Sequence, residues 1–179
     1  RTKMKKIIGI AGKAHSGKDT VANYLWERYG FTRLAFADPV KMSAQIMFGL
    51  NNDQTWNPAF KEIEIPFWGM SPRWMFQELG ENAKTVGGPD IWIKRLAVSL
   101  GALPEDDVVI PDVRFESEAD FVRGLGGVIL HLERPDAEPV RNHVSERGIG
   151  FHPGDWLLPN DADLPNLYTR LESLIEMLP

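Results

Sequence analysis

The sequence lacks cysteine, long runs of basic residues and long apolar runs. With no Cys among 179 residues, disulfides and thiolate metal ligands are excluded, and a reducing compartment is favoured. The formal net charge is −5, and no cluster of Lys and Arg is long enough to indicate binding to a nucleic acid polymer. No segment approaches the ~18 apolar residues of a membrane-spanning helix. A compact basic pocket for a small anion stays possible, because local charge need not follow net charge.

Strands and helices are expected to alternate along a single domain, residues 1–179. Hydrophobicity and turn residues predict strands at 5–12, 31–37, 106–113 and 128–135. Helices are expected at 18–29, 38–48, 71–79, 91–100, 117–125 and 164–178, with caps at Asp38, Ser71, Asp90 and Ser117. Residues 50–70 are expected to be irregular. This order predicts a doubly wound α/β fold with a parallel sheet, whose ligands bind beyond the carboxyl ends of the strands.

A glycine-rich loop follows the first expected strand. Gly12, Gly17 and Lys18 satisfy the pattern G-x-x-x-x-G-K, in which small residues let the backbone wrap closely around a phosphate. Backbone N–H groups and the positive end of the next helix would bind the anion, and Lys18 would add a point charge. The loop indicates a nucleoside triphosphate.

The residue after the motif lysine is Asp19, where such loops usually carry a hydroxyl that binds Mg²⁺. In one interpretation the Asp19 carboxylate binds the cation directly or through water. In the other, Thr20 serves the phosphates and Asp19 only favours the helix N-terminus, by ~0.3–1 kcal/mol.

Two other expected strands end in charged residues that could meet a second substrate. Asp112 lies at the tip of the third strand, where a carboxylate can order magnesium, and Arg114 could bind a phosphate through its forked guanidinium. The alternative is an Asp–Arg ion pair that only closes the loop. Asp38 and Lys41 follow the second strand, and there the alternative is a helix cap beside a solvated lysine.

The expected helix at 71–79 places Arg73 and Gln77 four residues apart, on one face. Arginine suits a phosphate and glutamine suits a base edge. Aromatic residues nearby could stack on a base or build a core, and core is favoured for any single one of them: Trp68, Trp74, Phe76 and Trp92.

The segment at about 135–155 is broken by proline and rich in basic residues. It could form a lid that carries arginines over the transferring phosphates, or a solvated loop. The candidate lid residues are Arg134, Arg141, His143 and Arg147.

Several blocks together resemble the phage-type deoxynucleoside monophosphate kinases. The blocks are GKAHSGKDTVANYL, FADPVK, WGMSPRWMFQELG and VVIPDVRFESEADF, followed by HVSE and PND. The resemblance covers about residues 7–174. It implies a P-loop NTPase three-layer α/β/α fold with a small helical substrate-binding insertion, at about 50–102, and a lid. It also implies transfer of the ATP γ-phosphoryl group to a deoxynucleoside monophosphate, with Mg²⁺, in the cytoplasm (of a host cell if phage-encoded), by a monomer or homodimer.

The residue patterns and the resemblance together predict roles for individual residues; the resemblance itself implies the ATP contacts and, for the acceptor, Arg73, Gln77 and Arg114. Lys18, Asp112 and Arg114 would be catalytic, and Asp19, Thr20 and Asp112 would be the candidate magnesium ligands. The ATP contacts would be Gly12, Lys13, Ser16, Gly17, Lys18, Asp19, Thr20 and, near the adenine, Asn160. The acceptor contacts would be Asp38, Lys41, Trp68, Arg73, Gln77, Trp92 and Arg114.

One departure from the family pattern concerns the acceptor. An arginine is expected between Gly80 and Trp92 and is missing, and Lys84 is its candidate replacement. Two other functions therefore stay open: a kinase for another small phosphate, such as phosphomevalonate or dephospho-coenzyme A, and a non-catalytic nucleotide-binding module.

Overall fold

A computed structural model describes residues 5–135 and 148–178. Three of the four candidate lid residues, Arg141, His143 and Arg147, lie outside the described residues. The chain divides into two compact units. Unit 1 comprises Arg1–Ala35 and Ser99–Pro179, and unit 2 comprises Phe36–Val98. The predicted insertion at about 50–102 overlaps unit 2, and its role in binding a substrate stays a prediction.

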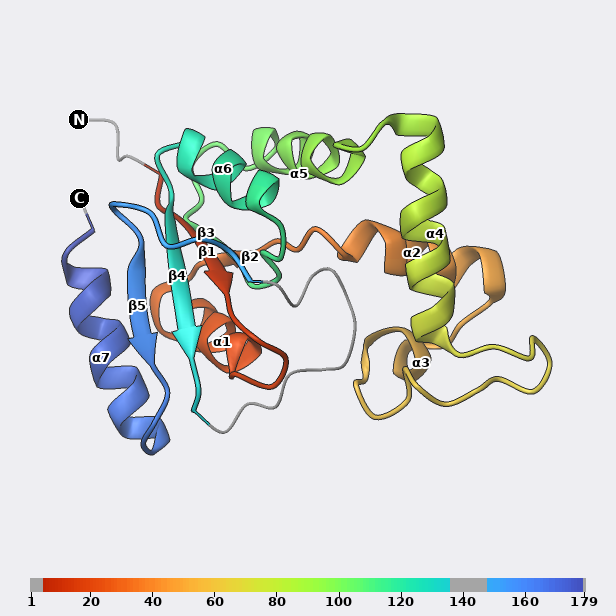
Figure 1. The fold of residues 1–179 in the computed structure, drawn as a ribbon, viewed down its shortest axis with the longest axis horizontal. Coiled ribbons are helices and arrows are strands. Elements are labelled where there is room, and N and C mark those ends of the chain that lie inside the picture. The colour runs from red at the N-terminus through yellow and green to blue at the C-terminus, as the bar shows by residue number, and fades with distance from the viewer. Residues whose placement is uncertain (1–4, 136–147, 179) are drawn as a thin grey trace. The chain divides into compact units, whose positions relative to one another are not determined.

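Unit 1 is built on a five-stranded parallel sheet with the order β2-β3-β1-β4-β5. The strands are β1 (Ile7–Ala11), β2 (Thr32–Arg33), β3 (Val108–Ile110), β4 (Val128–Glu133) and β5 (Trp156–Pro159). Figure 1 shows the arrows of β1, β4 and β5 pointing the same way. The carboxyl ends of the strands therefore share one edge of the sheet, as the α/β prediction requires.

Helices cover both faces of this sheet. The side chains of β1 show how closely a helix can approach each face. Ile8 and Ile10 point into a core shared with α1 (Lys18–Tyr29) and α7 (Leu164–Glu176). Gly9 lies between them on the opposite face, because side chains alternate along a strand. A Cβ on Gly9 would lie 2.8 Å from Ile129 and 3.4 Å from Val122 of α6 (Glu116–Gly124). Glycine thus lets α6 approach β1, and the result is three layers.

Unit 2 contains the helices α2 (Asp38–Phe48), α3 (Asn52–Trp56) and α4 (Pro72–Gly87), and most of α5 (Ile91–Gly101). Its core joins Ala44, Leu50 and Met75. An isolated antiparallel bridge between Ile65 and Met70 closes the loop before α4. The fold of this unit depends on helix–helix packing, with no named strand among its described residues.

Several sequence predictions about element boundaries are wrong. The cap of α2 is Ala37, so Asp38 is the first helical residue rather than the N-cap. The expected cap Ser117 lies inside α6, whose N-cap is Phe115. The expected irregular segment contains α3, and β5 was not predicted at all.

Helix α4 also runs eight residues beyond its predicted end at Leu79, through Gly80 to Gly87. Glycine does not end the helix here, because at Gly80 the helix packs against α2. The nearest atom to a Cβ on Gly80 would be Val40 of α2, 3.9 Å away, and the Gly80 carbonyl accepts the indole N–H of Trp92 at 3.2 Å.

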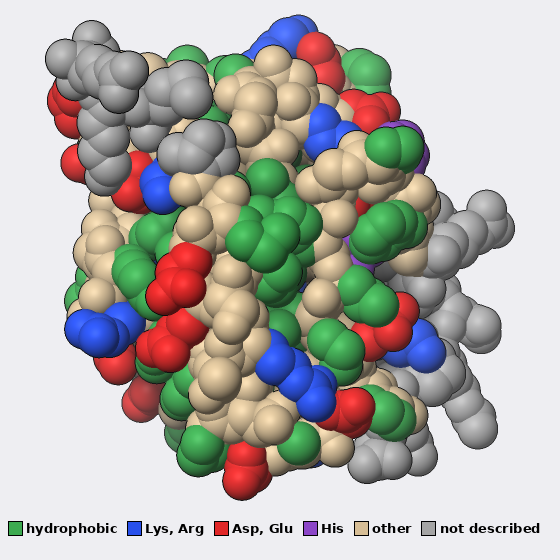
Figure 2. All heavy atoms as spheres, turned by 90° about the vertical axis from the view of Figure 1, so that its left-hand side faces the viewer, with side chains coloured by type: hydrophobic (Ala, Val, Ile, Leu, Met, Phe, Trp, Pro, Cys, Tyr) green, Lys and Arg blue, Asp and Glu red, His purple; other side chains and the backbone are tan. Residues whose placement is uncertain are grey.

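Figure 2 looks onto the side of unit 1 that α7 and β5 form, where basic, acidic and hydrophobic side chains are interspersed. Among the described residues, no helix combines the length and the apolar character that crossing a bilayer requires.

Candidate functional site

The glycine-rich loop connects β1 to α1 at the carboxyl edge of the sheet, and two of its glycines are sterically required. A Cβ on Gly12 would lie 2.7 Å from the Leu132 carbonyl oxygen and 2.7 Å from Ser16 Oγ. Gly17 has φ +102°, in the left-handed region, and its Cβ would lie 2.9 Å from Asn160 Nδ2. The loop therefore lies tightly against the ends of β4 and β5, as a phosphate-binding loop must to expose its N–H groups.

Two polar side chains of the loop have the arrangement that an anion site needs. Lys18 Nζ donates to the carbonyl oxygens of Gly12 at 2.7 Å and Lys13 at 2.6 Å, so the ammonium group lies over the loop. The Ser16 residue is 1% exposed, and its hydroxyl has no hydrogen-bond partner among the described residues. A buried donor without a partner costs roughly 1–3 kcal/mol, so a ligand atom or water is expected there.

The loop is also connected to the residues that follow β4 and β5. Asn160, directly after β5, donates from Nδ2 to the Ser16 carbonyl oxygen at 2.8 Å. Arg134, directly after β4, approaches the carbonyl oxygen of His15 at 3.5 Å. His15 has φ +61°, unusual for a residue with a side chain. Of the candidate lid residues, Arg134 alone is described, and it lies beside the loop.

The two candidate magnesium ligands of α1 have different environments. The exposed Asp19 carboxylate pairs with Arg33 of β2 at 2.7 Å, whereas Thr20 is half-buried. Arg33 was not among the predicted site residues. The pairing supports the interpretation in which Asp19 has a role other than metal binding, and both interpretations stay predictions.

Asp112 and Arg114 follow β3 beside the loop, because the Val113 N–H donates to the carbonyl oxygen of Ile10 at 3.3 Å. Asp112 is half-buried and Arg114 is exposed. The buried carboxylate of Glu118, at the start of α6, accepts the backbone N–H groups of Arg114 at 2.7 Å and Phe115 at 3.1 Å. Glu118 thereby fixes the backbone that carries Arg114.

The surroundings of Glu118 raise the pKa of its carboxyl group. Burial raises its pKa to about 7, and the nearby Asp112 carboxylate acts in the same direction. The N–H groups of Arg114 and Phe115 oppose the rise, because they stabilise the ionised form. Sequence reasoning missed Glu118, since a glutamate in the first turn of a helix usually signals only a cap or a dipole contact.

In unit 2, the predicted pair Arg73 and Gln77 lies one turn apart on α4, with Arg73 half-buried and Gln77 exposed. Arg73 Nε donates to the Glu62 carboxylate, and the backbone N–H of Arg73 donates to the carbonyl oxygen of Lys61 at 2.8 Å. The guanidinium is therefore held by the preceding loop. Glu62 was not predicted, and no motif in the sequence points to it.

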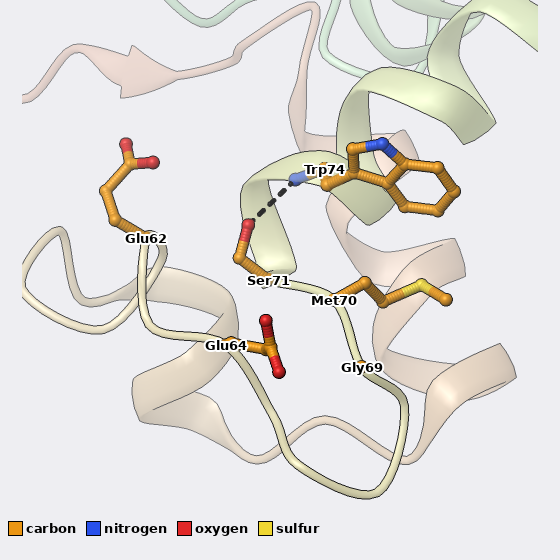
Figure 3. Close-up of a pocket in the computed structure, with 6 residues that line it drawn as sticks. All are labelled: Glu62, Glu64, Gly69, Met70, Ser71 and Trp74. Carbon is orange, nitrogen blue, oxygen red and sulfur yellow. Dashed lines mark hydrogen bonds between the residues drawn. The ribbon is translucent and has the colours of Figure 1, made fainter.

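A cavity of about 360 Å³ lies beside Glu62, the residue that pairs with Arg73. Figure 3 shows that its lining comes from the loop and the start of α4, where the Ser71 hydroxyl accepts the backbone N–H of Trp74 at 3.3 Å. The lining residues are Glu62, Glu64, Gly69, Met70, Ser71 and Trp74. Carboxylates, a hydroxyl and an indole together offer mainly hydrogen-bond acceptors and an apolar surface.

The other predicted acceptor residues of unit 2 have structural contacts. Trp68 donates from Nε1 to the Phe48 carbonyl oxygen at 3.1 Å and packs edge-on against the Phe48 ring. The indole N–H of Trp92 donates to the Gly80 carbonyl oxygen, as described above. Lys41 Nζ lies 5.2 Å from the centre of the Trp56 ring, a cation–π distance. Asp38 occupies the first turn of α2. These contacts favour scaffold roles for the two tryptophans.

Outside the loop, Glu116, Asp120 and His152 lie close enough together to suggest a metal site. Arg123 already supplies the cation: Nη1 donates to Glu116 at 2.8 Å and to Asp120 at 3.0 Å. Its other nitrogens bind the buried Asp155 carboxylate. The cluster is thus a structural ion-pair network between α6 and the segment before β5.

A family model described as deoxynucleotide monophosphate kinase matches residues 6–71 and 69–171. The chain belongs to this family. A protein of Acanthamoeba polyphaga mimivirus, provisionally named deoxynucleotide monophosphate kinase, is 31% identical over 95% of this chain and 96% of its own length. The deoxynucleotide monophosphate kinase of Enterobacteria phage T4 is 21% identical over 97% of this chain and 100% of its own length. The resemblance expected from the sequence blocks is therefore confirmed.

Solved structures show the same fold at lower identity. TT1252 from Thermus thermophilus superimposes with a TM-score of 0.54 at 20% identity, covering 99% of this chain and 100% of the other. Dephospho-CoA kinase from Campylobacter jejuni gives 0.51 at 12% identity, covering 97% of each chain. These matches and the parallel sheet confirm the P-loop NTPase fold. Membership of the deoxynucleotide monophosphate kinase family supports phosphotransferase activity on a small nucleotide, with ATP as the donor that such kinases use.

Proposed function

We propose that this protein transfers the γ-phosphoryl group of ATP to a deoxynucleoside 5′-monophosphate and releases the diphosphate. One observation carries the proposal: within the matched residues 6–171, a tightly packed loop has a lysine over it and a buried serine hydroxyl that has no hydrogen-bond partner in the described part of the chain. That loop is built to receive an anion, and the family indicates which anion.

The residues of unit 1 would act mainly by positioning and by neutralising charge, which is what phosphoryl transfer requires. The N–H groups of the loop and the Ser16 hydroxyl would bind the donor phosphates. Lys18 would leave its carbonyl partners and pair with charge on the transferred group. Arg114, exposed and fixed at its backbone by Glu118, would bind a phosphate through its guanidinium.

The oxygen donors near the loop fit Mg²⁺, since a hard cation prefers carboxylate and hydroxyl ligands. Thr20 with Asp112 would hold it, directly or through water, while Asp19 stays paired with Arg33 at 2.7 Å. The ion, when bound, supplies charge neutralisation between the phosphates.

Unit 2 would bind the acceptor. Arg73 suits the monophosphate, and the Glu62 carboxylate that binds it now would be exchanged for a phosphate of the same charge sign. Gln77, one turn further along α4, would contact the base. The indole hydrogen bonds of Trp68 and Trp92 would keep these elements in place.

The decisive assay incubates purified protein with ATP and Mg²⁺ and each of the deoxynucleoside and ribonucleoside monophosphates, scored for diphosphate product. We expect at least one deoxynucleotide to be phosphorylated. Parallel reactions contain phosphomevalonate or dephospho-coenzyme A, and product in those alone would replace the proposed acceptor. Tight ATP binding without any product would indicate a nucleotide-binding module instead.

A further inference from the structure

The residue after β5 connects two parts of unit 1 that are far apart in the sequence. Asn160 donates its backbone N–H to the Glu133 carbonyl oxygen at 2.6 Å, which extends the β4–β5 ladder by one residue. Its side-chain Nδ2 donates to the Ser16 carbonyl oxygen at 2.8 Å, across 144 residues of sequence. The backbone of Asn160 is therefore fixed by the sheet, and its amide reaches the phosphate loop from a rigid support.

We propose that Asn160 is a positioning residue that sets the direction of the Gly17 N–H for phosphate binding; this inference rests on the proposed function. Ser16 and Gly17 share one peptide group. Because that group is planar and trans, its C=O and N–H point in opposite directions. Holding the Ser16 carbonyl oxygen toward Asn160 therefore turns the Gly17 N–H away from β5.

The packing around Gly17 makes this arrangement rigid. A Cβ on Gly17 would lie 2.9 Å from Asn160 Nδ2, closer than side-chain carbons pack. The amide thus occupies the space that any other residue at position 17 would need. Glycine at 17 and asparagine at 160 are fitted to each other.

Asn160 complements Lys18 in fixing the loop. Lys18 Nζ binds the carbonyl oxygens of Gly12 and Lys13 at the start of the loop, whereas Asn160 binds that of Ser16 at its end. In the proposed reaction Lys18 pairs with phosphate and releases its carbonyls. The hydrogen bond from Asn160 uses no group that the phosphate needs, so it can persist when the anion is bound.

This role differs from the adenine contact that the family resemblance implies for Asn160, and the two roles predict different ligand dependence. A residue that contacts the base affects ATP but not a ligand that lacks the base. A residue that aims a phosphate-binding N–H affects both ligands by the same factor. Inorganic tripolyphosphate with Mg²⁺ is therefore the discriminating probe.

The experiment measures the dissociation constants of Mg²⁺–ATP and Mg²⁺–tripolyphosphate by calorimetry for the wild type, Asn160→Ala and Asn160→Asp. Asn160→Ala is expected to weaken both ligands by roughly tenfold, the value of one hydrogen bond to a buried group. Asn160→Asp keeps the shape but cannot donate when ionised, so a larger loss is expected for both. Asn166→Ala, on the exposed part of α7 in the same unit, is the matched control and should bind both ligands like the wild type.

Thermal unfolding without ligand checks that the variants remain folded, and Asn160→Asp tests the same donor should the alanine variant fail to fold. Unchanged affinity for both ligands in the folded variants would overturn the inference. Weakened ATP with unchanged tripolyphosphate would also overturn it, in favour of a base contact. A wild type that binds neither ligand would defeat the phosphate-loop function itself, together with the inference. A wild type that binds both but phosphorylates no monophosphate would defeat only the proposed acceptor.

Discussion

The two units hold their candidate residues in different ways. In unit 1 the phosphate loop is fixed by residues that are distant in sequence: Asn160 lies 144 residues from Ser16. In unit 2, Arg73 is held by Glu62, which is only 11 residues away in the sequence and lies at an exposed loop position. Unit 1 presents a site whose backbone is preformed, whereas unit 2 presents side chains with local, exchangeable partners. Under the proposed function, substitutions in the two units should therefore affect donor binding and acceptor binding separately.

The largest effect is expected from Lys18→Ala. This change removes the point charge from the loop, and loss of a preorganised charge or donor typically costs 10²–10³-fold in turnover, so we expect a loss of roughly that size or more. Steady-state kinetics with ATP and the best acceptor measures it. The melting temperature of the variant checks that it remains folded. Near-normal turnover would contradict the assignment of the loop.

Arg73→Ala tests the other side of the comparison. Loss of one charge-assisted hydrogen bond should raise the KM of the acceptor roughly 10–100-fold, with the dissociation constant of ATP unchanged. Arg28→Ala, in the exposed last turn of α1, removes the same charge elsewhere and should change neither value. A parallel loss of ATP affinity in the Arg73 variant would show that the two units do not divide the substrates between them.

The same contrast explains what the sequence could predict. The helix after the loop was placed correctly at Lys18–Tyr29, since the strand, glycines and apolar face act locally. Strand β5 was missed because its four residues, Trp156–Pro159, become a strand only by pairing with β4. The end of α4 was misplaced at Gly80 because packing against Val40 of α2 outweighs the low helix propensity of glycine.

Site residues follow the same division. The glycines and Lys18 belong to a motif whose spacing encodes the loop, so the sequence placed them correctly between β1 and α1, and their role in binding phosphate stays a prediction. Glu118 and Arg33 act through contacts that the sheet and helix packing create, and neither has a motif. Trp68 and Trp92 each donate the indole N–H to a backbone carbonyl oxygen, a contact between segments that no local pattern encodes, and their role in binding a substrate stays a prediction.

Glu118 predicts a pH effect on stability in unit 1. Its pKa is about 7 in the folded protein against an ordinary value of 4.5. The folded state therefore binds this proton more tightly, and the contribution to stability is greatest below about pH 4.5 and is lost as pH rises to about 7. At about 1.4 kcal/mol per pKa unit, the loss is at most roughly 3 kcal/mol.

Urea unfolding at pH 5 and pH 8 measures this effect. Glu118→Gln stays neutral at both values, so its free energy of unfolding should fall less between them than that of the wild type. Glu27→Gln, at an exposed position of α1, is the control and should retain the wild-type difference. An equal fall in the Glu118 variant would assign the pH dependence to other groups.

The smallest effect is expected at Asp19. Its ion pair with Arg33 has side chains that are 74% and 44% exposed, and such pairs contribute about 0–1 kcal/mol to stability. Asp19→Asn and Arg33→Ala should each change the free energy of unfolding by less than ~1 kcal/mol.

The dependence of turnover on Mg²⁺ tests which residue binds the cation. If Thr20 binds it, Asp19→Asn changes the Mg²⁺ concentration for half-maximal turnover by no more than about twofold, whereas Thr20→Val raises that concentration by a larger factor, because a hydroxyl ligand is lost. A strong rise for Asp19→Asn alone would mean that the carboxylate leaves Arg33 and binds the metal, and that the site of unit 1 is less preformed than its hydrogen bonds indicate.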